Sequence, residues 1–275
     1  MSGYTHRPKI NEELKETKFF PVCVDNFFRD PDAIREWGLS LDMKPDGNGT
    51  WPGERSLPLH EINTELNQYI LIKAVSSYFD LRFQNFSWER SSAHFQKIKK
   101  YSDDSSNKVN EGWIHTDGNK VDGIGSTNNQ LAGLIYLTPD ADLDGGTSLF
   151  KLKKEHEETY QLFKMTPEKH AYYKKHDGSN EEETITNISD KNYKEAILKH
   201  NSKFEETLRF QNVYNRLILY GQNEFHRANS YHVGDSDRLT LVFFINDITT
   251  EKYPTERVRD YEEFDSSIEK IIKWK

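Results

Sequence analysis

The sequence has almost none of the residues that build disulfide-bonded or membrane-spanning chains. Cys23 is the only cysteine among 275 residues, which excludes a disulfide framework and favours a reducing compartment, so we expect a cytoplasmic protein. Cys23 lies in a short apolar stretch and is expected to be buried and unreactive. No run approaches about 18 apolar residues, so no membrane span is predicted. The N-terminal segment lacks the apolar core of a secretory signal.

A strong excess of positive charge is also missing. The chain has 37 Lys and Arg against 45 Asp and Glu, and its net charge is −8. This charge balance argues against a protein that binds nucleic acid over a broad surface. What the sequence does contain is bulky core material, with 16 Phe, 14 Tyr and 5 Trp, so we expect a folded globular chain.

The order of the predicted elements favours an α+β, mainly β, fold. Asp30 and Pro31 form a helix start, and the apolar spacing that follows predicts a helix over 31–41. A second helix is predicted over 60–80, after a loop over 42–60. Strand patterns occupy 82–101, 111–150 and 210–248. Strands and helices do not alternate, which argues against a doubly wound parallel sheet and for a β-sandwich or barrel with flanking helices.

Two further segments differ from this pattern. Residues 151–208 are rich in Lys, Glu, His and Asn and have little strand signal, so they predict a mostly helical insertion. In the tail, Tyr261, Phe264, Ile268 and Ile271 share a helical register, which predicts a C-terminal helix.

His115 and Asp117 are the first candidate site residues. On a strand, side chains at i and i+2 point to the same face, so a ring nitrogen and a carboxylate oxygen approach one point. His226 is a candidate third ligand from a distant strand, and His232 is its alternative. Two His and one carboxylate with open positions form the donor set of non-haem Fe(II) oxygenases. The competing interpretation is a His at a strand end and an Asp that opens a turn.

Arg238 opens a strand whose residues alternate cleanly. Arg238, Thr240, Val242 and Phe244 share one face, and the other face is entirely apolar. A guanidinium group on a rigid strand matches a carboxylate with two parallel hydrogen bonds, although a surface salt bridge on an edge strand is the alternative. Tyr136 is a candidate to lend its hydroxyl to the same carboxylate, or else is an ordinary core residue.

These residues together resemble a known superfamily. The resemblance rests on the ordered set His115-x-Asp117, Tyr136-Leu137, Gly145-Gly146-Thr147-Ser148-Leu149-Phe150, His226 and Arg238. It is to the Fe(II)/2-oxoglutarate-dependent dioxygenases, and most closely to their prolyl-hydroxylase-like branch. It covers roughly 92–248 without the insertion. A weaker likeness to the N-terminal portion of this superfamily involves 24–28 and 51–55.

The resemblance implies a fold and a division of the chain. It implies one oxygenase domain over 1–275 with a double-stranded β-helix, or jelly-roll, core. The implied parts are N-terminal support over 1–90, the core over 91–150 and 209–248, the helical insertion over 151–208 and the C-terminal helix over 249–275.

The resemblance also implies a site and a reaction. His115, Asp117 and His226 would bind Fe(II), while Arg238, helped by Tyr136, would hold the distal carboxylate of 2-oxoglutarate. With dioxygen, the enzyme would hydroxylate a C–H bond of a peptidyl or small polar substrate and release succinate and CO2. The alternatives are a non-catalytic jelly-roll binding module and a cupin-like metalloenzyme that does not use 2-oxoglutarate.

Several supporting roles are left open by the sequence. The other end of 2-oxoglutarate has Gln96 or Tyr101 as candidate partners. Ring N–H groups of the ligand histidines need acceptors, and the candidates are Asn119, Asn128, Asn129 and Asn223. The segments 42–60 and 102–112 and the insertion are expected to form the mouth through which the substrate enters.

Overall fold

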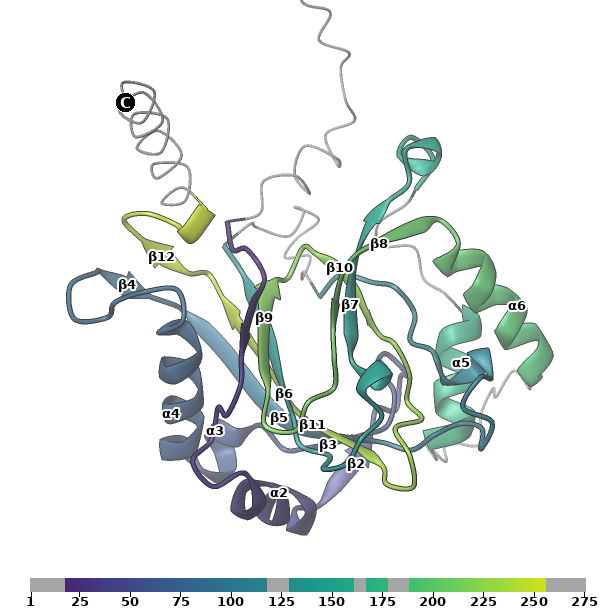
Figure 1. Cartoon of the computed structure of the whole chain (residues 1–275), viewed down its shortest axis with the longest axis horizontal. Helices are drawn as coiled ribbons and strands as arrows, with labels where there is room; N and C mark the ends of the chain where they lie inside the picture. Colours follow the sequence, from purple (N-terminus) through teal and green to yellow (C-terminus); the bar gives the residue numbers. More distant parts are fainter. Residues whose placement is uncertain (1–17, 118–128, 161–166, 178–187, 256–275) are drawn as a thin grey trace, which may run out of the picture.

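Two antiparallel sheets face each other in the computed structural model, which describes residues 18–117, 129–160, 167–177 and 188–255 (Figure 1). The large sheet contains, in spatial order, β1 (Val22–Val24), β9 (Leu217–Gly221), β6 (Leu131–Tyr136), β11 (Arg238–Asn246), β5 (Arg90–Ile98), β3 (Glu54–Ser56) and β2 (Met43–Pro45). The small sheet contains β10 (Phe225–Ala228), β7 (Thr147–Leu152) and β8 (Phe204–Phe210). A third pair consists of β12 (Thr249–Thr250) and β4 (Phe86–Ser87).

From β5 onward the chain passes back and forth between the two sheets. The strands β6, β9 and β11 belong to the large sheet, whereas β7, β8 and β10 belong to the small one. His115, which precedes β6, joins the small sheet through a bridge to His226. The inner faces pack on each other through apolar residues such as Leu134 of β6 and Leu149 of β7. This arrangement is a jelly roll, so the predicted mainly β fold class is confirmed.

The first three described helices cover the outer face of the large sheet, and the other two lie on the side of the small sheet (Figure 1). The described α-helices are α2 (Pro31–Ser40), α3 (Leu59–Ile62), α4 (Thr64–Val75), α5 (Pro167–Asp177) and α6 (Asp190–Asn201). The side chain of Asp30 accepts a hydrogen bond from the Ala33 backbone N–H and caps α2, which confirms the helix predicted there. Gly38 lets α2 approach the sheet closely, because a Cβ at this position would lie 2.4 Å from the Phe95 ring.

The outer layer differs from the prediction in two places. The helix predicted over 60–80 is two helices, because Asn63 ends α3 and its side chain accepts a hydrogen bond from Leu66 N to cap α4. The loop predicted over 42–60 contains β2 and β3. β3 is a strand because it pairs with β5, and β2 because it pairs with β3. Such long-range pairing leaves no periodic signal in two segments of three residues.

The insertion is shorter than predicted. It contains α5 and α6, but β7 runs to Leu152 and β8 begins at Phe204, so both ends of the segment 151–208 belong to the small sheet. The middle of β8 is exposed, which hid its strand character behind polar residues. The C-terminal helix predicted over 249–275 is wrong at its start, where Thr249–Thr250 form a strand that pairs with β4. From position 256 onward the predicted helix lies outside the described residues. None of the described helices is long and apolar enough to cross a membrane.

Cys23 corrects a further expectation, because its thiol is exposed. It lies in β1, an edge strand, between Val22 and Val24, which pack against the core. Successive side chains of a strand point to opposite faces, so Cys23 points away from that core.

Asn215 connects the segment before α2 to the start of β9. Its side chain accepts a hydrogen bond from Phe28 N and donates one to Phe28 O, both at 2.8 Å, and its backbone has a φ of 62°. We expect Asn215→Ala to lower the free energy of unfolding by about 2–4 kcal/mol, because two buried hydrogen bonds are lost and alanine is strained in the left-handed region. Urea denaturation measures this.

The matched control is Asn48→Ala, at an exposed position, which should change the free energy of unfolding by less than about 0.5 kcal/mol. Equal stability of the two variants would show that this connection does not hold the N-terminal segment in place.

Candidate active site

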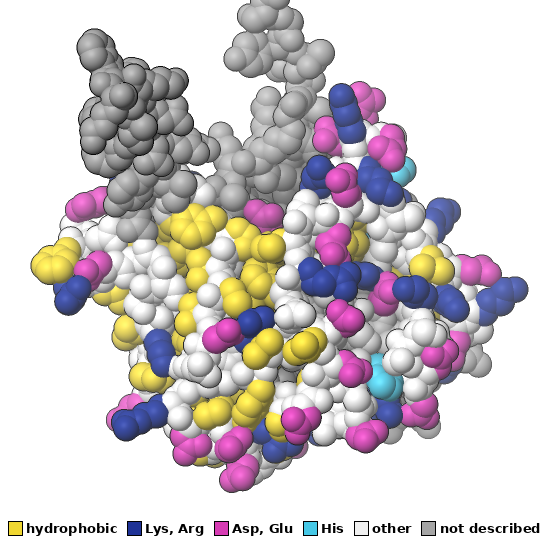
Figure 2. All heavy atoms as spheres, viewed as in Figure 1, with side chains coloured by type: hydrophobic (Ala, Val, Ile, Leu, Met, Phe, Trp, Pro, Cys, Tyr) yellow, Lys and Arg dark blue, Asp and Glu magenta, His cyan; other side chains and the backbone are white. Residues whose placement is uncertain are grey.

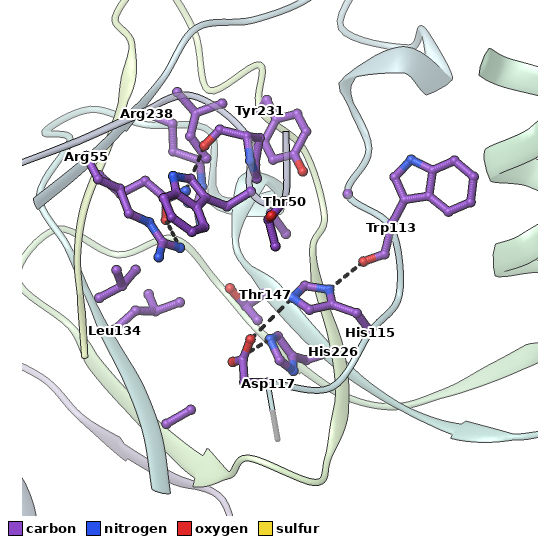
Figure 3. Close-up of a pocket in the computed structure, with 18 of the residues that line it drawn as sticks. Thr50, Arg55, Trp113, His115, Asp117, Leu134, Thr147, His226, Tyr231 and Arg238 are labelled. Atoms are coloured by element: carbon purple, nitrogen blue, oxygen red, sulfur yellow. Dashed lines mark hydrogen bonds and ion pairs between the residues drawn. The ribbon is translucent and has the colours of Figure 1, made fainter. Parts of the chain in front are cut away.

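Three sequence-predicted residues meet inside the barrel (Figure 3). His115 and His226 exchange two backbone hydrogen bonds, of 3.0 and 2.9 Å, which sets their rings 4.4 Å apart. Asp117 follows on the same segment, and its backbone N–H donates to Gln222 O. Its carboxylate lies 3.1 Å from Nε2 of His226 and 3.5 Å from Nε2 of His115. His232, the alternative third ligand, lies elsewhere, 3.8 Å from Asp142.

Backbone carbonyls orient both rings. Nδ1 of His115 lies 2.8 Å from Trp113 O, and Nδ1 of His226 lies 3.0 Å from Glu224 O. A carbonyl only accepts, so each Nδ1 carries a proton and each Nε2 points toward Asp117. Nε2 donates to the carboxylate when the ring is protonated and offers a lone pair to a metal ion when the ring is neutral. The sequence pointed to asparagines for this role. Asn119 and Asn128 lie outside the described residues, and the side chain of Asn129 donates to Ile248 O instead.

Burial and mutual charge set the electrostatics of the three groups. Burial alone would raise the pKa of the Asp117 carboxyl, but the adjacent imidazoles, His226 first, hold it well below its usual range. Burial opposes the charged form of His226, yet Asp117 beside it raises the pKa of that ring. Burial and the neighbouring His226 lower the pKa of His115. The cluster therefore holds a firmly ionised carboxylate between two imidazoles.

This donor set fits a divalent transition metal. The three donor atoms lie within 4.8 Å of one another. Adjacent ligands at about 2.1 Å from a common metal are about 3 Å apart, close to the two nitrogen–oxygen distances here. A ligand face of two imidazoles and one carboxylate suits Fe(II) and leaves the remaining coordination positions open.

The three residues line a cavity of about 430 Å³, within the usual range of ligand pockets. His115 is 43% exposed, and it faces this space. Arg238, the first residue of β11, lies across the cavity from the cluster (Figure 3). As predicted, its face of the strand turns inward, with Val242 and Phe244 also lining the cavity, while the alternate apolar residues join the helix-covered core.

Arg238 is a buried cation that forms no ion pair with any described residue. It is 3% exposed, and its Nε and Nη2 have no hydrogen-bond partner in the described part of the chain. Burial lowers the pKa of the guanidinium group, opposed by Tyr136, whose ring centroid lies 5.7 Å from Cζ. Leaving charged donors unsatisfied in the interior is costly, so the site is built to receive an anionic ligand.

Tyr136 has a different place from the one expected of a ligand-binding residue. It is fully buried among the apolar residues between the sheets and does not line the cavity. Burial raises the pKa of its hydroxyl to about 12, against the lowering effect of Arg238. The hydroxyl makes only a marginal contact with Thr147 and no hydrogen bond of ordinary geometry. Its role toward a carboxylate stays a prediction.

The other two candidates for 2-oxoglutarate are separated by the structure. Gln96 lines the cavity, but its amide is engaged, donating to Pro52 O and accepting from Arg55. Tyr101 does not line the cavity, and its hydroxyl lies 3.2 Å from Asp177.

The segments expected to form the mouth contribute residues to the lining of the cavity, and their place at its entrance stays a prediction. Thr50 and Trp51 belong to the predicted loop, Gly112 to the second segment, and Lys169 and Tyr173 to α5 of the insertion. Arg55 and Lys169 are two further cations that line the cavity, and the sequence predicted no role for either of them. Trp51 and Arg55 belong to the segment 51–55, whose weak likeness to the N-terminal portion of the superfamily gives neither residue a role. No local sequence pattern marks Lys169.

These features define a jelly-roll protein with a candidate metal centre and a cationic cavity inside the barrel. The chain belongs to DUF6445, described as a family of unknown function, whose model matches residues 7–241. Comparison with curated proteins gives no significant match.

Solved structures that are similar to this chain include proteins bound to 2-oxoglutarate or named for it. HygX from Streptomyces hygroscopicus, with nickel and 2-oxoglutarate bound, has 12% identity and a TM-score of 0.47 over 88% of both chains. SnoN, a non-haem alpha-ketoglutarate-dependent epimerase from nogalamycin biosynthesis, has 10% identity and a TM-score of 0.45 over 90% of this chain and 85% of its own.

A prolyl hydroxylase from Trichoplax adhaerens, in complex with a hypoxia inducible factor peptide fragment, has 11% identity and a TM-score of 0.45, covering 86% of this chain and 87% of its own. At such low similarity the reaction has to be inferred from the side chains of this chain itself.

Metal binding should stabilise the folded chain. We expect Co(II) at a hundredfold excess over its Kd to raise the free energy of unfolding by about 2.7 kcal/mol, because the ligands converge only in the native state. Asp117→Ala should abolish this stabilisation, as measured by chemical denaturation with and without Co(II).

The control for the metal experiment is His232→Ala, which removes an imidazole outside the cavity and should leave Co(II) stabilisation unchanged. Equal loss in both variants would indicate binding at another site.

Asp177, at the end of α5, gives a pH prediction. It accepts a hydrogen bond from Gly53 N at 2.8 Å, and burial raises its pKa to about 6. Between about pH 4 and 6 the folded chain holds a proton that the unfolded chain has released, so stability falls as pH rises through this window. We expect Asp177→Asn, which keeps the acceptor without the charge, to be more stable than the wild type at pH 7.5 by at most about 3 kcal/mol.

That advantage should disappear near pH 4, as urea denaturation at several pH values can test. Asp235→Asn, at an exposed position, should give no such pH-dependent difference. A wild type more stable than Asp177→Asn at pH 7.5 would show that the hydrogen bonds of the charged carboxylate outweigh its burial.

Proposed function

We propose that this protein is an Fe(II)- and 2-oxoglutarate-dependent oxygenase that hydroxylates a C–H bond of a peptidyl or small polar substrate. The observation that supports this most is the pairing of two features in one cavity. A His115–Asp117–His226 cluster suited to Fe(II) faces it, and so does Arg238, a buried cation with unpaired donors. A molecule that has a metal-chelating end and a distal carboxylate satisfies both.

The chain's own residues would then have distinct tasks. His115 and His226 present Nε2 to the metal because Trp113 O and Glu224 O hold their Nδ1 protons. Asp117 offsets part of the metal charge.

Arg238 fixes the distal carboxylate and so the direction in which the cosubstrate lies. Val242 and Phe244 on the same strand face keep the surrounding wall apolar, which limits access of water. When bound, Fe(II) with 2-oxoglutarate and dioxygen supplies the oxidising chemistry, with succinate and CO2 as co-products.

Turnover of 2-oxoglutarate tests the proposal directly. Purified protein with Fe(II), ascorbate and 2-oxoglutarate should form succinate in air, slowly without the true substrate, and His115→Ala should form none. Arg238→Gln should weaken 2-oxoglutarate binding by about tenfold to a hundredfold, because charge-assisted bidentate hydrogen bonds are lost. Its Co(II) affinity should be retained, which shows that the variant is folded.

The outcomes separate the proposal from its alternatives. Metal binding without any 2-oxoglutarate binding would favour a cupin-like metalloenzyme. Binding of 2-oxoglutarate and metal with no succinate, even in the presence of candidate substrates, would favour a binding module. Arg29→Gln, an exposed cation outside the cavity, serves as the control and should behave as the wild type.

A further inference from the structure

The cavity is lined by more cationic side chains than the proposed binding of a metal and 2-oxoglutarate requires. Besides Arg238, it is lined by Arg55 of β3 and Lys169 of α5. Asp117 is the only carboxylate among the described residues that line it. A metal ion bound by Asp117 takes up that negative charge, and 2-oxoglutarate directed to Arg238 leaves the other two cations without an anion.

Arg55 is held in place by neutral groups. Its guanidinium group lies over the Trp51 ring, 4.4 Å from the centroid, and Nη2 donates to Gln96 Oε1 at 3.3 Å. Gln96 is itself fixed by its hydrogen bond to Pro52 O. Nε of Arg55 is buried without a hydrogen-bond partner in the described structure, and the side chain extends into the cavity in Figure 3. The side chain is therefore positioned by its neighbours but not neutralised by them.

Lys169 approaches from the insertion. Its ammonium group has no ion pair within the described residues. Nζ lies 5.8 Å from the ring centroid of Tyr173. Burial lowers the pKa of Lys169 to about 8, while Asp117 acts in the opposite direction. Burial likewise lowers the pKa of Arg55 to about 10, again opposed first by Asp117. Both cations thus lie within the electrostatic range of the candidate metal ligands.

The two cations also come from segments that pack together. The loop before β3 touches α5, because Gly53 N donates to Asp177 and a Cβ on Gly49 would lie 2.5 Å from His170 O. The walls that bear Arg55 and Lys169 are thus held in a defined relation. On the surface seen in Figure 2, by contrast, cationic and anionic side chains are interspersed.

We propose that Arg55 and Lys169 bind an anionic group of the substrate, a carboxylate or a phosphate, and hold it beside the metal and the cosubstrate. This rests on the proposed function and narrows its substrate class to small acidic molecules or acidic residues. Arg55 supplies planar hydrogen-bond donors, Lys169 supplies a compact charge, and Gln96 is a positioning residue for Arg55.

Anion binding to the loaded protein tests this without any catalysis. The full-length chain is first saturated with Ni(II), which does not turn over, and with 2-oxoglutarate. Inorganic phosphate is then titrated calorimetrically at constant ionic strength, with glycerol as the uncharged probe. We expect one phosphate per chain and no heat from glycerol. Arg55→Gln and Lys169→Gln should each weaken phosphate binding by about tenfold or more.

Two variants keep the result interpretable. Arg55→Lys retains the charge and should recover part of the phosphate affinity, whereas Lys194→Gln on the exposed face of α6 should have no effect. Affinity for 2-oxoglutarate should stay within about twofold of the wild type in Arg55→Gln and Lys169→Gln, which also shows that they are folded.

Three results would overturn the proposal while leaving the proposed function intact. Phosphate binding that is absent, or is unchanged by both substitutions, would mean that these residues do not form an anion site. A loss of 2-oxoglutarate affinity in Arg55→Gln as large as in Arg238→Gln would place Arg55 in the cosubstrate site instead. Failure of the proposed function is seen earlier, as the absence of Ni(II) or 2-oxoglutarate binding before phosphate is added.

Discussion

The buried carboxylate of Asp117 is the constraint on which the rest of the site depends. An isolated charge in the protein interior is costly, and it is tolerated only where opposite charge or hydrogen-bond donors surround it. Here two imidazoles, when protonated, supply this positive charge from 3.1 and 3.5 Å. They reach those positions because His115 and His226 form a backbone bridge, and two carbonyls fix the protons on the far side of each ring. Backbone pairing, ring tautomer and carboxylate charge form one interdependent arrangement.

The jelly roll makes that arrangement compatible with a stable core. β11 shows how, since one face of the strand packs against helices through Leu241 and Phe243 while the other turns Arg238 into the cavity. The largest cluster of buried apolar residues lies between the large sheet and the outer helices, so the space between the sheets is free to contain polar groups. A helical insertion between β7 and β8 leaves this scaffold unchanged because it is attached at the ends of two paired strands.

The charge inside the barrel gives the cavity its character. The face of the molecule seen in Figure 2 carries mixed charges, whereas the described lining of the cavity combines three cations with a single carboxylate. Two of these cations, Arg55 and Lys169, come from β3 near the edge of the large sheet and from α5 of the insertion, and only Arg238 belongs to a central strand. In the proposed function, the central strands supply groups for the metal and the cosubstrate, and the peripheral segments supply the groups that would distinguish one substrate from another.

Features that depend on neighbours along the chain are predictable from the sequence. The cap at Asp30, the shared face of His115 and Asp117 and the alternation of β11 follow from local geometry, and so the helix α2, the mainly β class and three of the site residues were predictable. Tertiary structure alone decided which strands pair. Strand pairing turned part of the predicted loop into β2 and β3 and left Cys23 exposed on an edge strand. The tertiary structure also placed His226, and not His232, beside His115 and Asp117. It placed Arg55 and Lys169 in the lining of the cavity. Pairing and burial join residues far apart in the chain, and no periodicity in a single segment encodes its distant partner.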